Sequence, residues 1–146
     1  MFLNLLLGSA EVFSFSERYG ADYSAYIQQA GAVYHGERDY TKLSSNQGPC
    51  YYPAGHIWHF VSAYWLHLQT DHAEYIIRFV FVVIHTLTIL FSTKIAFFYF
   101  GQDQVHRAQI IAFILLGNVH DRSYYSLIYN DEAMMLYLVL CIYCLL

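Results

Sequence analysis

The residues of this chain that could do chemistry are concentrated in one stretch, "HGERDYTKLSSNQGPCYYPAGH", residues 35–56. It carries four charged side chains and several turn-forming glycines and prolines, whereas the rest of the chain is apolar and aromatic. Charged side chains so concentrated in an apolar chain, among them Arg38 and Lys42, could form a binding site. The alternative is an ordinary solvated loop, in which these cations pair with Glu37 and Asp39 and stabilise the fold by at most about 1 kcal/mol.

The eight histidines raise the question of a metal site. His56 and His59 are three residues apart, so a helix would place them on one face. However, no pair has the H-E-x-x-H spacing of a helical zinc site. Histidines on the polar side of an amphipathic helix are the more ordinary arrangement. We therefore predict no metal and no cofactor.

Two of the three cysteines, Cys141 and Cys144, form a C-x-x-C sequence inside the apolar run "AMMLYLVLCIYCLL". Redox-active pairs of this kind depend on nearby positive charge, and this run contains none. We interpret the pair as two small apolar residues of a membrane helix.

The composition indicates a membrane protein. Hydrophobic residues make up 58% of the chain and charged residues only 12%, whereas soluble domains carry about 25% charged residues. Fifteen tyrosines suit a protein with much surface at the membrane–water boundary. The net charge of −4 leaves no basic patch, which argues against nucleic acid as a partner.

The strongest structural signal is the apolar run at 75–100. From Phe79 to Thr93 it contains no Asp, Glu, Lys or Arg. A helix of this length would reach about 39 Å, enough to cross the ~30 Å hydrocarbon core. Arg78 and Lys94 stand toward its ends, from which long basic side chains can extend to the headgroups. The sequence therefore predicts a transmembrane helix here.

A second helix is predicted at 54–68, where apolar residues recur at helical spacing. The stripe consists of Ile57, Val61, Tyr64, Trp65 and Leu68. Because His56, His59, Ser62 and Ala63 fall largely on the other side, we expect this helix to lie along the membrane surface. A short membrane span is the alternative.

These observations predict an all-α, polytopic transmembrane protein whose long loop carries interfacial amphipathic helices. Its expected segments are a membrane-helix remnant at 1–14, a loop at 15–74, the transmembrane helix at 75–100, a second loop at 101–108, a short membrane segment at 109–118, a third loop at 119–132 and a truncated transmembrane helix at 133–146.

The order of short motifs in this chain resembles a known family. "ADYSAYIQQ" at 21–29 is followed by "GERDYTKL" at 36–43, then by Gly48-Pro49 and "YPAGH" at 52–56, and much later by "YND" at 129–131. This series resembles the first lumenal loop of the endoplasmic reticulum α-1,3-mannosyltransferases that use dolichyl-phosphate-mannose. The chain would correspond to roughly the first third of such an enzyme.

The resemblance implies an enzyme of the GT-C type in the endoplasmic reticulum membrane, with several spans and a lumenal active site. The implied reaction transfers mannose from dolichyl-phosphate-mannose in α-1,3 linkage to the lipid-linked oligosaccharide Man5GlcNAc2-PP-dolichol, in the assembly of the asparagine-linked glycan precursor. The implied mechanism is an inverting single displacement. The lipid bilayer and the two lipid-borne substrates are the expected partners.

The resemblance also implies roles for individual residues. Asp22 matches the aspartate of the family's first loop and is the candidate base, although a helix N-cap is the alternative. Candidates for binding the leaving phosphate are Arg38, Lys42, His56 and Arg122. The expected topology brings Arg122, Asn130 and Asp131 to the same side of the membrane as Asp22, and Asn130 and Asp131 are further candidates for binding substrate.

Two further interpretations remain open. The first is a polytopic membrane protein without catalysis, such as a transporter, which would place ionisable residues inside its spans. In this sequence nearly all of them fall in the expected loops, with His85 as the main exception. The second is an inactive, truncated copy of the transferase, which the apolar end of the chain motivates.

Overall fold

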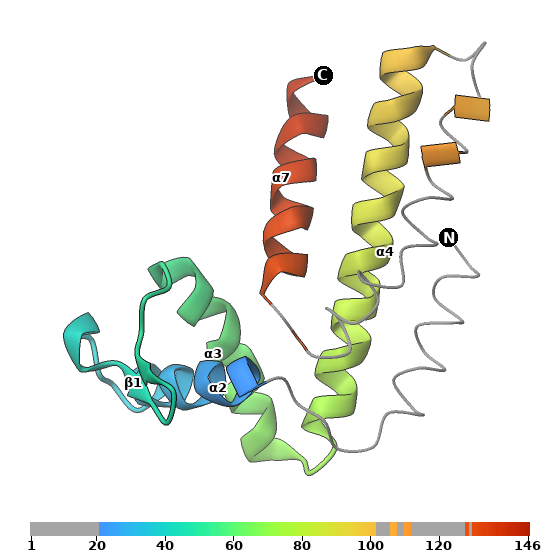
Figure 1. The fold of residues 1–146 in the computed structure, drawn as a ribbon. Helices are drawn as coiled ribbons and strands as arrows, with labels where there is room; N and C mark the ends of the chain where they lie inside the picture. Colours follow the sequence, from blue (N-terminus) through green and yellow to red (C-terminus); the bar gives the residue numbers. More distant parts are fainter. Residues whose placement is uncertain (1–20, 102–105, 108–109, 112–127, 129) are drawn as a thin grey trace.

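The computed structural model describes residues 21–101, 106–107, 110–111, 128 and 130–146 (Figure 1). Its elements, in chain order, are helix α2 (Ala21–Tyr34), a 3-10 turn η1 (Tyr40–Lys42), strands β1 (Ser44–Ser45) and β2 (Gly48–Pro49), and helices α3 (Ala54–Gln69), α4 (Ala73–Phe100) and α7 (Asp131–Leu145).

The described chain is mostly helical rather than all-α, because the polar loop after α2 contains a small antiparallel hairpin. Ser44 pairs with Pro49, and Ser45 pairs with Gly48. Gly48 has φ +118°, a conformation that glycine adopts without the steric cost other residues incur. The hydroxyl of Ser45 accepts a bond from the backbone N–H of Gln47 and donates to the carbonyl of Gly48, so the turn is closed by its own residues.

Helices α2 and α3 pack against each other and form one unit with the hairpin (Figure 1). Their shared core is aromatic and includes Tyr23, Tyr26 and Phe60, which continue to Ile77 and Phe81 of α4. A second small buried cluster lies next to the hairpin and consists of Val33, Leu43, Cys50 and Ile57.

The face of α3 that packs against the rest of the protein combines part of the predicted stripe with residues expected on the polar side. The buried residues are His56, Ile57, Phe60 and Ala63, whereas Trp65 and Leu68 of the predicted stripe are exposed. The exposed Trp65 and Leu68 are compatible with the predicted placement along a membrane surface, which stays a prediction. His56, expected on the polar side, is instead buried against Tyr26 of α2. The helix itself, predicted at 54–68, is confirmed with one added residue.

Helix α4 is 28 residues long, about 42 Å, and begins two residues before the predicted start. Among the described residues it is the one helix long and apolar enough to cross a membrane. It ends at Phe100, and Gly101 follows with φ +76°, a backbone conformation that glycine adopts without the steric cost other residues incur. Arg78 is 1% exposed, so the expectation that its side chain extends to the headgroups is wrong.

Helix α7 lies beside the half of α4 that ends at Phe100 (Figure 1). It begins at Asp131, two residues before the predicted 133, and its 15 residues reach about 22 Å. Cys141 and Cys144 are free and exposed on it. The segments predicted at 1–14, 101–108, 109–118 and 119–132 lie wholly or largely outside the described residues.

Candidate functional site

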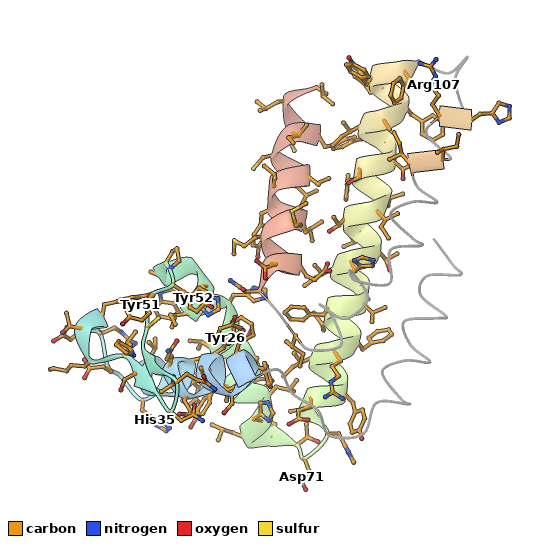
Figure 2. The ribbon with its side chains drawn as sticks, viewed as in Figure 1. Tyr26, His35, Tyr51, Tyr52, Asp71 and Arg107 are labelled. Atoms are coloured by element: carbon orange, nitrogen blue, oxygen red, sulfur yellow. The ribbon has the colours of Figure 1, made fainter. Side chains whose placement is uncertain are left out.

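The start of α7 meets α2 and α3 at a pair of tyrosines (Figure 2). The hydroxyl of Tyr26, on α2, lies 3.3 Å from the hydroxyl of Tyr52, just before α3. The Tyr26 hydroxyl also donates to Oδ1 of Asn130, at 3.4 Å. Tyr26 is 2% exposed. Its hydrogen bond to Asn130 joins residues that are 104 positions apart in the chain.

The carboxylates of Asp22 and Asp131 both influence the pKa of Tyr26. Burial raises the pKa of Tyr26 far above its usual value, the hydrogen bond with Tyr52 raises it further, and the negative charges of Asp22 and Asp131 add to the effect. Tyr26 therefore stays neutral. Asp22 stands one helical turn before it, where i and i+4 side chains are neighbours.

Asp22 lies in the first turn of α2, since the helix begins at Ala21. Asp22 is therefore a residue of the helix and not its N-cap. A carboxylate in this position is stabilised by the positive end of the helix dipole. Its side chain is half-buried, so the carboxylate remains within reach of a ligand.

His56 completes the group from the first turn of α3. Its ring stacks on Tyr52 at a centroid distance of 4.3 Å and meets Tyr26 edge-on at 4.4 Å. The side chain is 2% exposed, and neither ring nitrogen has a hydrogen-bond partner in the structure of the described residues. Burial lowers the pKa of His56 to about 4, and the neighbouring His59 contributes. At neutral pH His56 is thus an uncharged donor and acceptor, not the cation that the sequence suggested.

Arg38 and Lys42 lie elsewhere. They follow the C-terminal end of α2, which is about 18 Å from Asp22 along the helix axis. The Arg38 guanidinium donates to the carbonyls of Val33 (2.6 Å) and Glu37 (3.0 Å). The structure does not bring these two predicted cations together with Asp22.

Local contacts occupy both side chains. The guanidinium of Arg38 lies over the ring of Trp58, 5.4 Å from its centre. Lys42 Nζ lies 3.5 Å from a carboxylate oxygen of Asp39. These are the kind of short-range interactions that the solvated-loop alternative predicts.

The remaining expectations concern Arg122 and metals. Arg122 lies outside the described residues, so its predicted place in the site stays a prediction. Within the part of the chain that the structure describes, no three His, Cys, Asp or Glu residues are grouped as metal ligands would be.

Sequence reasoning missed the two tyrosines that hold the group together. A signal existed for Tyr26, because it follows Asp22 by four residues within a helical pattern. Tyr52 belongs to the "YPAGH" motif, but its position does not reveal that its hydroxyl faces α2. The sequence also did not indicate that Glu132 would pair with His85.

The assembled group has a definite chemical character. It combines an accessible carboxylate, Asp22, with uncharged hydrogen-bonding groups: two phenols, an imidazole and an amide. Uncharged donors and acceptors beside aromatic rings suit a polyhydroxylated ligand, and the carboxylate can accept a proton from one of its hydroxyls.

Comparison with known proteins now gives this group a context. A family model described as ALG3 protein matches residues 12–146. A relative from Kluyveromyces lactis, named Dol-P-Man:Man(5)GlcNAc(2)-PP-Dol alpha-1,3-mannosyltransferase, is 27% identical over 124 residues, covering 83% of this chain and 25% of the relative. No solved structure matches significantly.

Other relatives match shorter parts. A Neurospora crassa protein of the same name is 42% identical over 45 residues, which cover 31% of this chain and 10% of the relative. A Dictyostelium discoideum protein, named as a probable enzyme of this kind, is 38% identical over 66 residues, covering 43% of this chain and 15% of the relative. The chain spans at most about a quarter of the length of these relatives. Because the family model covers nearly all of its residues, the chain belongs to the ALG3 protein family.

Proposed function

We propose that this protein transfers mannose from dolichyl-phosphate-mannose, in α-1,3 linkage, to Man5GlcNAc2-PP-dolichol. The names of its relatives supply the reaction. The observation that carries the proposal for this chain is the convergence on Tyr26: Asp22 from α2, His56 from α3 and Asn130 from the start of α7 gather around one buried phenol.

In the proposed reaction, the acceptor's 3-hydroxyl oxygen attacks the anomeric carbon of the donor mannose. The bond between that carbon and the phosphate oxygen breaks, and dolichyl phosphate leaves with the electron pair. Asp22 takes the proton of the attacking hydroxyl. A well-placed base contributes about 10²- to 10⁴-fold to a rate of this kind. A single displacement inverts the anomeric carbon, so a β-linked donor yields an α-linked product.

Other groups then hold the sugars. We propose that Asn130 and Asp131, which are accessible, bind substrate hydroxyls. His56 is buried, so we propose that it acts through Tyr52, on which its ring stacks, rather than by touching the sugar. Arg122, Arg38 and Lys42 remain the candidates for the phosphate. For Arg38 and Lys42 this role requires the donor to lie along the length of α2.

We also propose a setting for the site, which is the lumenal face of the endoplasmic reticulum membrane in a multi-pass, GT-C-type protein. At about 42 Å, α4 exceeds the ~30 Å hydrocarbon core by about 12 Å, or eight residues. The excess fits a helix that projects from the bilayer where α2 and α3 pack against it. The exposed Trp58 and Trp65 of α3 suit the membrane–water boundary.

The test is made in cells that lack their own α-1,3-mannosyltransferase of this pathway. The wild-type protein should extend the five-mannose lipid-linked glycan by one residue. Asp22→Asn preserves shape but removes the base, and should lower turnover at least 100-fold. Asp71→Asn, which alters an exposed carboxylate on the turn before α4, should leave turnover unchanged (Figure 2).

A stably expressed wild-type protein that leaves the five-mannose glycan unextended would contradict the proposed reaction. Wild-type turnover by Asp22→Asn would remove Asp22 as the base while leaving the reaction in place. One observation favours the non-catalytic alternative: the helices bury Arg78, His85 and Glu132, and ionisable residues inside spans are typical of transporters. Unextended glycan is the result that this alternative predicts.

A further inference from the structure

The proposed chemistry leaves one buried ionisable pair without a role. Nδ1 of His85, in the middle of α4, lies 3.1 Å from Oε2 of Glu132, in the first turn of α7. The two side chains are only 7% and 8% exposed. The contact joins positions 47 residues apart and is the kind of interaction that apolar helix packing does not require.

Away from this pair the α4–α7 interface is mostly apolar: Leu136 and Val139 of α7 are buried, and the ring of Tyr143 meets Phe91 and the Lys94 ammonium of α4 at the other end. Hydrophobic attraction itself is not directional, so it selects the register of two helices less sharply than a hydrogen bond between fixed positions does. A buried polar pair adds little net stability compared with well-packed apolar residues, and its best-attested use is to select one register. His85 and Glu132 supply a buried hydrogen-bonding contact at one end of this interface.

That contact lies next to the candidate site in sequence and in space. Asn130, two residues before Glu132, accepts the hydrogen bond from Tyr26. Asn130 stands at the N-cap of α7, but its side chain does not cap the helix, so Tyr26 engages it instead. The first turn of α7 is thus held from two sides, by α2 through Asn130 and by α4 through Glu132.

We propose that His85 and Glu132 are positioning residues: their contact sets the register of α7 on α4 and thereby places Asn130 and Asp131 beside Tyr26 and Asp22. The importance of this placement rests on the proposed function. The geometric claim does not, and it is tested without any measurement of mannose transfer.

The test measures a distance in the purified protein, reconstituted in lipid nanodiscs. Spin labels are attached to cysteines introduced at Ser62 on α3 and Met134 on α7, both exposed, in a background with the three native cysteines changed to alanine. Pulsed electron paramagnetic resonance gives the distance distribution between the labels. The wild-type protein should give a narrow distribution.

The decisive variant is the double change His85→Leu with Glu132→Leu, which removes the contact without leaving a buried charge. Its helix content, measured by circular dichroism, should stay at the wild-type level, while the width of the distance distribution at least doubles. Glu132→Gln should keep the narrow distribution, because its amide oxygen can still accept a hydrogen bond from the imidazole. Thr93→Val is the matched control, since the Thr93 hydroxyl bonds only to the Ile89 carbonyl of its own helix.

A wild-type width in the double-leucine variant would overturn the proposal. So would broadening in Glu132→Gln or in Thr93→Val equal to that of the double-leucine variant, since the effect would then not depend on this hydrogen bond. A protein that fails to extend the glycan but shows the expected distances would contradict the proposed function alone.

Discussion

At the scale of single residues, the site is governed by burial more than by formal charge. Tyr26 and His56 both titrate in water, yet burial holds each in its neutral form, because charging either would cost solvation that the core does not replace. Asp22, half-buried at a helix N-terminus, keeps partial access to solvent. The candidate site therefore consists of one carboxylate, Asp22, beside neutral hydrogen-bonding groups.

The burial of His56 predicts an acid-sensitive fold. Its pKa is about 4 in the folded protein, against about 6.5 unfolded, so between these values the unfolded state binds more protons. The free energy of unfolding should therefore have its full value above pH 6.5 and fall as the pH drops toward 4. Urea unfolding in micelles at pH 7 and pH 5 measures this, and His56→Phe should reduce the slope by less than about 1.4 kcal/mol per pH unit, the limit for one proton.

The histidine control for this experiment is His72→Gln, since His72 is exposed on the turn before α4. It should keep the wild-type slope. Burial also lowers the pKa values of His59 and His67, so some slope should survive in His56→Phe. An identical slope in wild type and His56→Phe would show that His56 is not buried in its neutral form.

At the scale of elements, the close packing of α2 on α3 positions Asp22, Tyr26 and His56. Gly31 of α2 faces the ring of Tyr64, and a methyl group added at Gly31 would meet ring atoms at 2.7–3.1 Å. Two contacts hold the ring: its hydroxyl lies 3.0 Å from Nε2 of His35, and its centre lies 5.4 Å from that of the Tyr34 ring. Arg38, over Trp58, ties the charged loop to the same helix pair.

Gly31→Ala should therefore destabilise the protein even though alanine favours a helix. Overpacking costs about 1–3 kcal/mol, whereas the gain in helix propensity is about 1 kcal/mol. We expect a net loss of about 1 kcal/mol in the free energy of unfolding. Gly55→Ala, in α3 with no atom within 4 Å of the added methyl, should be neutral or stabilising. Equal effects of the two changes would mean that α2 and α3 are not packed at Tyr64.

At the scale of the whole molecule, two helix pairs are joined end to side (Figure 1). Helices α2 and α3 form a compact unit with the charged loop, and α7 lies along α4 above it. The candidate site lies where the units meet, so it needs residues from both ends of the described chain. If α4 crosses the bilayer, the unit of α2 and α3 must stay on one side of it.

The proposed lumenal placement of the loop between α2 and α3 can be tested by introducing a glycosylation site. The sequence has no Asn-x-Ser or Asn-x-Thr acceptor for glycosylation, but Lys42→Asn would create one, because Leu43 and Ser44 follow. Lys42 is exposed, so the new site should be glycosylated in microsomes and lose the added mass on treatment with a glycosidase. Lys42→Gln, which creates no acceptor, should not change in mass. An unmodified Lys42→Asn protein with its loop open to protease from the cytosolic side would contradict the lumenal placement.

What the sequence alone determined was local. The apolar run that became α4 and the helix after "YPAGH" follow from residue types and spacing over a few turns, and the family follows from short motifs in a fixed order. What the tertiary structure decided was which faces meet. It buried His56, expected on the polar side of α3, and it left Arg38 and Lys42 at the far end of α2 from Asp22. It also joined His85 to Glu132. Helical periodicity shows which side chains share a face, but the face that becomes buried depends on neighbouring helices that are distant in the chain.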